Sequence, residues 1–121
     1  MKKTIVMALE PYPDISLSDI QNRIELIECE KDLAILFAIA ENKAWWVEDE
    51  IYDYEEGSDD YRKACEITDA WFELADKLKV LIFEILKLEG VSIPKTGQIE
   101  VLTPFMERNG FEDRNGWWVK K

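Results

Sequence analysis

The chain has 121 residues, 47% of them hydrophobic, with a formal net charge of −11 and no histidine. This length suits one domain with one core, and the negative charge excludes direct binding to nucleic acid, which needs lysine and arginine to replace condensed counterions. The absence of histidine removes the usual general base and the commonest zinc ligand, and no stretch approaches the roughly 20 apolar residues that span a bilayer.

The N-terminal segment predicts a strand followed by a linker. Residues 4–9 form a short run that begins with β-branched side chains. Pro11 and Pro13 come next, and each fixes its own φ and disfavours a helical residue before it. We therefore expect extended chain there.

A first long helix is predicted over about 18–56. Ser18 and Gln21 have the spacing of a capping box, and neither proline nor glycine occurs between them and Gly57. Apart from its start, this helix carries a continuous pattern of apolar residues at helical spacing.

The apolar face of this helix runs from Leu33 to Tyr54 in steps of three and four residues. The isoleucines that precede it also have helical spacing, but they do not extend into the same face. We therefore expect a kink or a short break near 29–32. Residues 33–40 are apolar on every side, which predicts burial all round.

A second long helix is predicted over about 59–89. Gly57 can close the first helix and Ser58 can cap the second, while Gly90 has the position of a Schellman stop. Because the connection between the two helices is short, they should be antiparallel neighbours.

The C-terminal tail predicts smaller elements. Pro104 suits the first position of a short helix that ends near Asn109. Residues 114–116 are typical of a hairpin turn, and the run 116–120 after them could pair with residues 4–9 as a small β-ribbon.

The sequence as a whole thus predicts a mainly α fold, with residues 1–121 as a single helical domain. Its apolar sectors are wider than one neighbouring helix covers, which favours a homodimer. Cys29 and Cys65 fit no metal or redox spacing, so we expect buried thiols in a reducing compartment, the cytoplasm.

Two tryptophan pairs, 45–46 and 117–118, stand out in the composition. Adjacent residues on a helix or a strand cannot share one face. We expect one member of each pair to point inward and the other outward, toward the core or toward a partner.

Acidic residues are concentrated in one part of the chain. Residues 18–57 hold twelve of the 26 carboxylates against three basic residues, and no basic residue occurs between Ala44 and Tyr61. Either a solvated helix end or a contact surface for a basic protein accounts for this cluster. Under the second interpretation the partner-binding residues are Glu48, Asp49, Glu50, Tyr52, Asp53, Glu55, Glu56, Asp59 and Asp60.

A metal site is the third interpretation. An acidic group on one helix followed by Glu-x-x-Asp on the next is similar to the motif of the all-α nucleoside triphosphate pyrophosphohydrolases, and the resemblance covers about thirty residues. It implies Mg²⁺-dependent hydrolysis, with Glu66 and Asp69 as an alternative second half. The metal ligands it implies are Asp49, Glu50, Asp53, Glu73 and Asp76. The four carboxylates of residues 66–76 occupy the helix face without apolar residues, which also predicts a plain solvated surface.

Three functional hypotheses follow. The first is a non-catalytic protein, with no cofactor, that binds a basic surface of another protein. In its sharpest form it mimics nucleic acid, and in class and composition it resembles the inhibitors, anti-CRISPR proteins among them, that phages and mobile elements use against defence enzymes. The second is the Mg²⁺-dependent pyrophosphohydrolase, and the third is a helical assembly module with no ligand.

Overall fold

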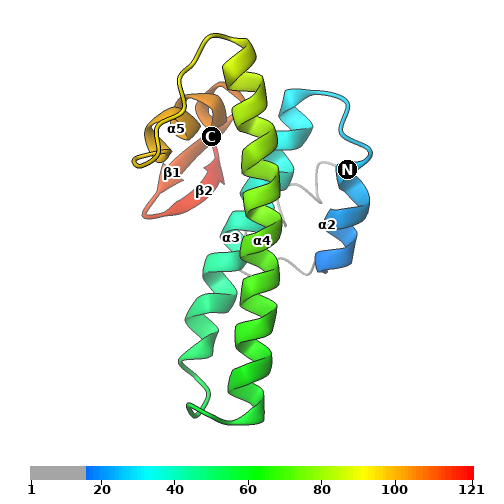
Figure 1. Ribbon diagram of the computed structural model, residues 1–121, viewed down its shortest axis with the longest axis vertical. Helices are drawn as coiled ribbons and strands as arrows, with labels where there is room; N and C mark the ends of the chain where they lie inside the picture. The colour runs from blue at the N-terminus through cyan, green and yellow to red at the C-terminus, as the bar shows by residue number, and fades with distance from the viewer. Residues whose placement is uncertain (1–15) are drawn as a thin grey trace.

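The computed structural model describes residues 16–121. In this part of the chain there are four helices and one antiparallel pair of strands: α2 (Leu17–Ile24), α3 (Glu30–Ile51), α4 (Asp59–Leu88), α5 (Ile99–Arg108), β1 (Phe111–Arg114) and β2 (Trp117–Lys120). The two long helices α3 and α4 pack side by side in opposite directions, with α2 on one side and α5 and the hairpin on the other (Figure 1). The predicted mainly helical fold with two long helices is confirmed.

A break in the first helix separates α2 from α3, as predicted, but it covers residues 25–29 and so lies slightly before the predicted 29–32. The Ser16 hydroxyl accepts from the Asp19 amide, and the Asp19 carboxylate accepts from the Ser16 amide, both at 3.2 Å. The capping box therefore begins at Ser16, and the prediction that Ser18 caps the helix was wrong. Buried Ile20 fixes α2 on the two long helices.

The core lies along the middle of α3. Residues 33–40 are buried except for Ile35, which is partly buried, so the predicted burial on every side is confirmed. It arises because α4, α2 and β2 each contact α3. Among the largest side chains enclosed there are Phe37, Leu78 and Ile82.

Both predicted ends of α4 are confirmed. The Ser58 hydroxyl accepts from the Tyr61 amide at 3.1 Å. At the other end Gly90 has φ +85°, and the Val91 amide donates to the Leu86 carbonyl at 2.9 Å, the longer hydrogen bond of a Schellman motif. By contrast, α3 ends at Ile51, several residues before its predicted end, and Gly57 lies in the connection.

The tail differs from its prediction at α5. This helix begins at Ile99, so Pro104 lies inside it and not at its first position. The predicted end is confirmed, since Asn109 caps α5. Next comes the hairpin β1–β2, whose turn residues Asn115 and Gly116 have φ values of +55° and +90°, as a two-residue type I′ turn requires.

The small ribbon therefore has β1 as one partner of β2, with Phe111 opposite Lys120 and Arg114 opposite Trp117. The predicted partner, residues 4–9, lies outside the described residues. None of the helices in residues 16–121 combines the length and apolar character that a membrane span needs.

Candidate functional site

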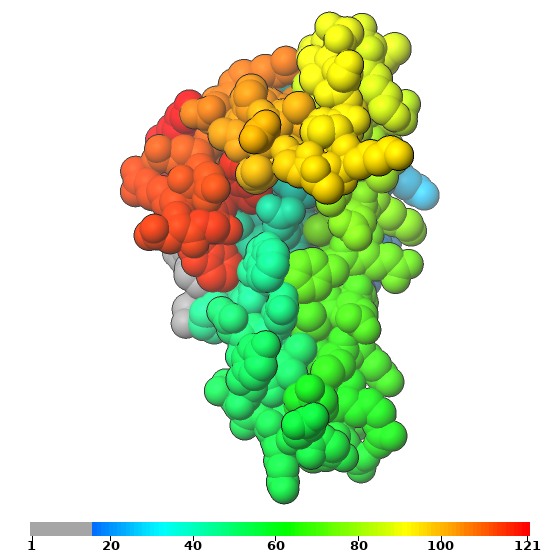
Figure 2. Space-filling view, turned by 60° about the vertical axis from the view of Figure 1, so that its left-hand side comes forward, coloured from blue at the N-terminus to red at the C-terminus, as the bar shows by residue number. Residues whose placement is uncertain are grey.

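The nine predicted partner-binding residues all lie at one end of the molecule. Glu48, Asp49 and Glu50 belong to the end of α3, Asp59 and Asp60 begin α4, and the others occupy the connection between them. We call this group of nine, from Glu48 to Asp60, the acidic tip. It projects beyond α5 and the hairpin, at the bottom of Figures 1 and 2.

The acidic tip is exposed and poorly neutralised. All its members except Glu48 and Glu50 are exposed, and Tyr52 is 81% exposed. Among the described residues only one of its carboxylates, that of Asp59, is in an ion pair, with Arg62. Most of the negative charge therefore faces solvent.

Local helix electrostatics favour only part of this arrangement. Asp59 and Asp60 lie in the first turn of α4, where the helix dipole stabilises negative charge. The opposite holds for α3, whose last turn has no basic residue and carries Asp49 and Glu50. Asp49 and Asp53 are four residues apart, but they do not repel each other along one helix face, because Asp53 lies beyond the end of α3.

The metal-ligand set of the pyrophosphohydrolase resemblance is not brought together. In residues 16–121 no three Cys, Asp or Glu side chains are close enough to hold one metal ion. Glu66, Asp69, Glu73 and Asp76 are all exposed on α4, as predicted for a solvated face, and Asp76 is paired with Lys79 at 3.3 Å.

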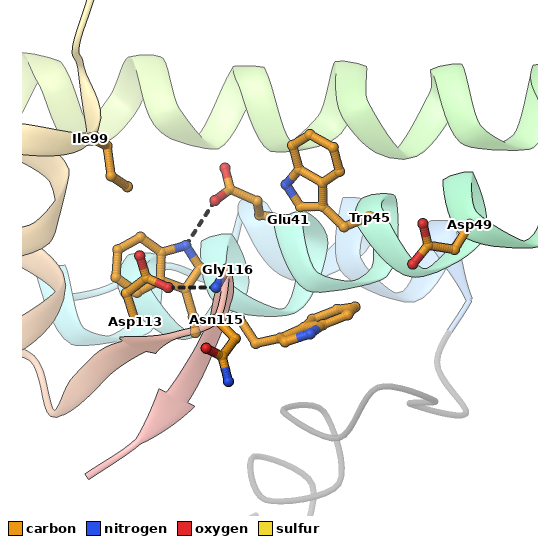
Figure 3. Close-up of a pocket in the computed structure, with 9 residues that line it drawn as sticks. Glu41, Trp45, Asp49, Ile99, Asp113, Asn115 and Gly116 are labelled. Carbon is orange, nitrogen blue, oxygen red and sulfur yellow. Dashed lines mark hydrogen bonds between the residues drawn. The ribbon is translucent and has the colours of Figure 1, made fainter.

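A second site lies beside the acidic tip, between α3 and the hairpin. A cavity of about 460 Å³ is lined by Glu41, Trp45, Asp49, Ile99, Asp113, Asn115, Gly116, Trp117 and Trp118. We call it the indole pocket. Glu41, Trp45 and Asp49 follow one another at four-residue intervals along one side of α3, opposite Asp113 and Asn115 of the hairpin (Figure 3).

Trp118 joins the pocket to the core through two consecutive residues of α3. The Asn42 amide group donates to the Trp118 carbonyl at 2.8 Å and accepts from the Trp118 amide at 2.9 Å. The indole N–H of Trp118 donates to Oε1 of Glu41 at 2.8 Å. Asn42 and Trp118 are both buried, so the hairpin is fixed on α3 by polar contacts inside the core.

Glu41 is partly buried, and burial raises the pKa of its carboxyl group above the ordinary value. The hydrogen bond from Trp118 and the charge of Lys79 act in the opposite direction, while Asp76 and Asp113 add to the increase. A carboxylate in a cavity with a perturbed pKa is a common feature of binding sites.

The sequence did not identify Glu41 as a site residue. One signal was present: the polar residues Glu41 and Asn42 end the apolar stretch 33–40, where another core position is expected to be apolar. Their partner, Trp118, is 76 or more residues away, and the pairing could not be inferred without the fold.

In both tryptophan pairs one member is more exposed than the other, and in the 117–118 pair the inner member is fully buried. Trp118 is buried and Trp117 only partly so, which confirms the expected split. Trp45 is 47% exposed and packs edge-to-face on Phe72, with 5.2 Å between ring centroids, while Trp46 is partly buried. Trp45 and Trp117 therefore place aromatic surface in the indole pocket.

The cysteine prediction was wrong for one residue. Cys29 is exposed, because it precedes α3 as its N-cap at the break in the helical chain, while Cys65 is partly buried in α4. Both are free thiols.

Comparisons of this chain with protein-family models, with curated proteins and with solved structures found no match.

Proposed function

We propose that this chain is a non-catalytic binding protein whose acidic tip binds a basic surface on another protein. The observation that supports this proposal is the set of exposed carboxylates at the α3–α4 end, of which only Asp59 has an ion-pair partner among the described residues. Charge at the end of α3 opposes the helix dipole, so helix stability gives no reason for it. A basic partner would neutralise it.

In its sharpest form the proposal is nucleic-acid mimicry. Carboxylates of the acidic tip would stand where a substrate has phosphates, and the protein would act as an inhibitor of a basic nucleic-acid-binding protein. Inhibitors of this class are encoded by phages and mobile elements, and we place the protein in the cytoplasm with them.

A homodimer is part of the same proposal. Val80, Leu81 and Leu88 on α4 are 53%, 40% and 89% exposed, and a second copy would cover such surface. The acidic tip is at the far end of α4 from Leu88, so a dimer formed there leaves it accessible.

The test is calorimetric titration of the chain against a panel of basic nucleic-acid-binding proteins, nucleases among them. We expect at least one to bind at about 50 mM salt and to weaken roughly tenfold or more at about 500 mM, because salt screens exposed charges. Excess duplex DNA should release the bound protein. An acidic protein of similar size is the negative control. Binding to no member of the panel at low salt, or binding that DNA leaves intact, would contradict the proposal of mimicry.

A further inference from the structure

We propose that the indole pocket binds the guanidinium group of an arginine side chain, which the basic partner supplies. This inference rests on the proposed function, because the arginine belongs to the surface that the acidic tip contacts. It adds a specific recognition site to a contact that would otherwise depend on diffuse charge.

The lining of the pocket selects a cation. Glu41, Asp49 and Asp113 contribute three carboxylates, and no lysine or arginine is part of the lining. The nearby cation that acts on Glu41, Lys79, is paired with Asp76 at 3.3 Å. A positively charged group entering the cavity therefore meets carboxylates that lack a cationic partner among residues 16–121.

The two carboxylate oxygens of Glu41 differ in their hydrogen bonding. Its Oε1 accepts from Trp118, whereas Oε2 accepts from no described residue. No side-chain nitrogen or oxygen of residues 16–121 is both fully buried and without a partner, so Oε2 keeps some exposure. The hydrogen bond from Trp118 holds the carboxylate in one orientation, so little conformational entropy remains to be lost on binding.

The aromatic lining selects a planar cation over a point charge. Arginine stacks on indole faces and donates parallel N–H groups to a carboxylate, whereas a lysine ammonium does neither as well. Trp45 is held by its edge-to-face contact with Phe72, and Trp117 faces the cavity from β2. A cavity of about 460 Å³ accommodates a long side chain.

The pocket is continuous with the acidic tip, because Asp49 belongs to both. A basic partner that approaches the tip would bring its side chains to the mouth of the pocket. That continuity favours a protein side chain over a free small cation as the natural occupant.

The experiment uses three blocked amino acids as probes: Nα-acetyl-arginine amide, the corresponding lysine compound and the corresponding citrulline compound. Citrulline is the neutral isostere of arginine, so it isolates the charge. With tryptophan fluorescence or NMR on the full chain, we expect millimolar binding of the arginine probe and roughly tenfold weaker binding of the other two. Equal binding of arginine and citrulline, or of arginine and lysine, would overturn the inference.

Variants separate the pocket from the tip. We expect Glu41→Gln and Trp45→Ala to weaken the arginine probe about fivefold or more. The triple variant Asp53→Lys, Glu55→Lys, Glu56→Lys should retain the probe, because none of these residues lines the pocket. If the wild type binds the basic protein but not the arginine probe, the pocket inference fails and the proposed function stands. If the wild type binds the probe but no basic protein, the proposed function fails. The claim that a basic partner supplies the arginine then fails as well.

Discussion

At the scale of single residues, Asn42 is the least expected feature of the core. It is only 1% exposed, and its side chain makes two hydrogen bonds to the backbone of Trp118. These two bonds satisfy both the amide and the carbonyl group of Trp118. An asparagine amide presents one donor and one acceptor side by side, as a neighbouring strand would. Through this side chain the helix α3 takes the place of a strand beside β2.

Replacing Asn42 with alanine leaves the buried amide and carbonyl groups of Trp118 without partners. We expect Asn42→Ala to lower the free energy of unfolding by about 2–4 kcal/mol, because each buried unsatisfied group costs about 1–3 kcal/mol. Urea denaturation measures this loss. The control Asn22→Ala, on the exposed side of α2, should stay within about 0.5 kcal/mol of wild type. Similar losses in the two variants would argue against the role given to Asn42.

Glu41 should make stability depend on pH in a definite direction. Its folded pKa is raised by burial, so its contribution to stability is fully present below the unfolded pKa and is lost as the pH rises through the folded pKa. Glu41→Gln keeps an oxygen acceptor for Trp118 and carries no charge. We expect this variant to be more stable than wild type at about pH 7, and we expect this difference in stability to disappear toward about pH 4.

Thermal unfolding across this pH range measures the difference in stability between Glu41→Gln and wild type. The variant Glu66→Gln, on the exposed face of α4, controls for the loss of one surface charge. A gap for Glu41→Gln that is constant with pH, or that widens as the pH falls, would show that the carboxyl of Glu41 is not destabilised by burial.

At the scale of elements, a single arginine ties three helices together. The guanidinium group of Arg108, at the end of α5, donates to both carboxylate oxygens of Glu30 at the start of α3. It also donates to both carboxylate oxygens of Glu89, the C-cap residue of α4, and all four distances are 2.8–3.0 Å. The hydrogen bonds to Glu89, and to a smaller extent those to Glu30, raise the pKa of Arg108. In turn, the hydrogen bond from Arg108 lowers the pKa of Glu30. The guanidinium also lies 5.1 Å from the centre of the Phe105 ring.

We expect Arg108→Met to lower the free energy of unfolding by about 1 kcal/mol, since the side chains of this network are more than a third exposed and solvent screens them. The control Arg62→Met breaks a fully surface pair within α4 and should change little. Because the pKa of Glu30 is lowered in the folded protein, the contribution of its carboxylate to folding stability is present above the unfolded pKa. This contribution disappears as the pH falls through the folded pKa. The effect of Arg108→Met should therefore shrink in acid, which denaturation at two pH values checks; an effect that persists unchanged would contradict it.

The elements show which features a sequence can and cannot predict. Ser58 and Gly90 were identified because their roles depend on a few neighbouring residues and on backbone conformation. Pro104 gave the wrong helix start, because α5 begins five residues earlier and contains this proline although it can donate no backbone hydrogen bond there. The acidic tip was predictable from composition, whereas the indole pocket was not, since Glu41 and Trp118 meet only when the hairpin folds back on α3.

At the scale of the whole molecule, charge and packing are separated in space. The acidic tip lies at the end of the molecule where α3 connects to α4. The polar and aromatic contacts that hold α5 and the hairpin lie at the middle and at the opposite end of these two helices (Figure 1). Substitutions at the tip should therefore leave the fold intact. This separation makes the surface testable by charge reversal, with circular dichroism as the check that each variant is folded.

The central claim is that the acidic tip, and not negative charge in general, is the binding surface. The most direct measurement compares two triple variants for one basic protein that the wild type binds at about 50 mM salt. The first, Asp53→Lys, Glu55→Lys, Glu56→Lys, reverses the tip; the second, Glu66→Lys, Asp69→Lys, Glu73→Lys, makes the same change in net charge on the exposed face of α4. We predict at least a roughly tenfold loss of affinity for the first and less than about threefold for the second. Equal losses in the two variants would contradict the claim.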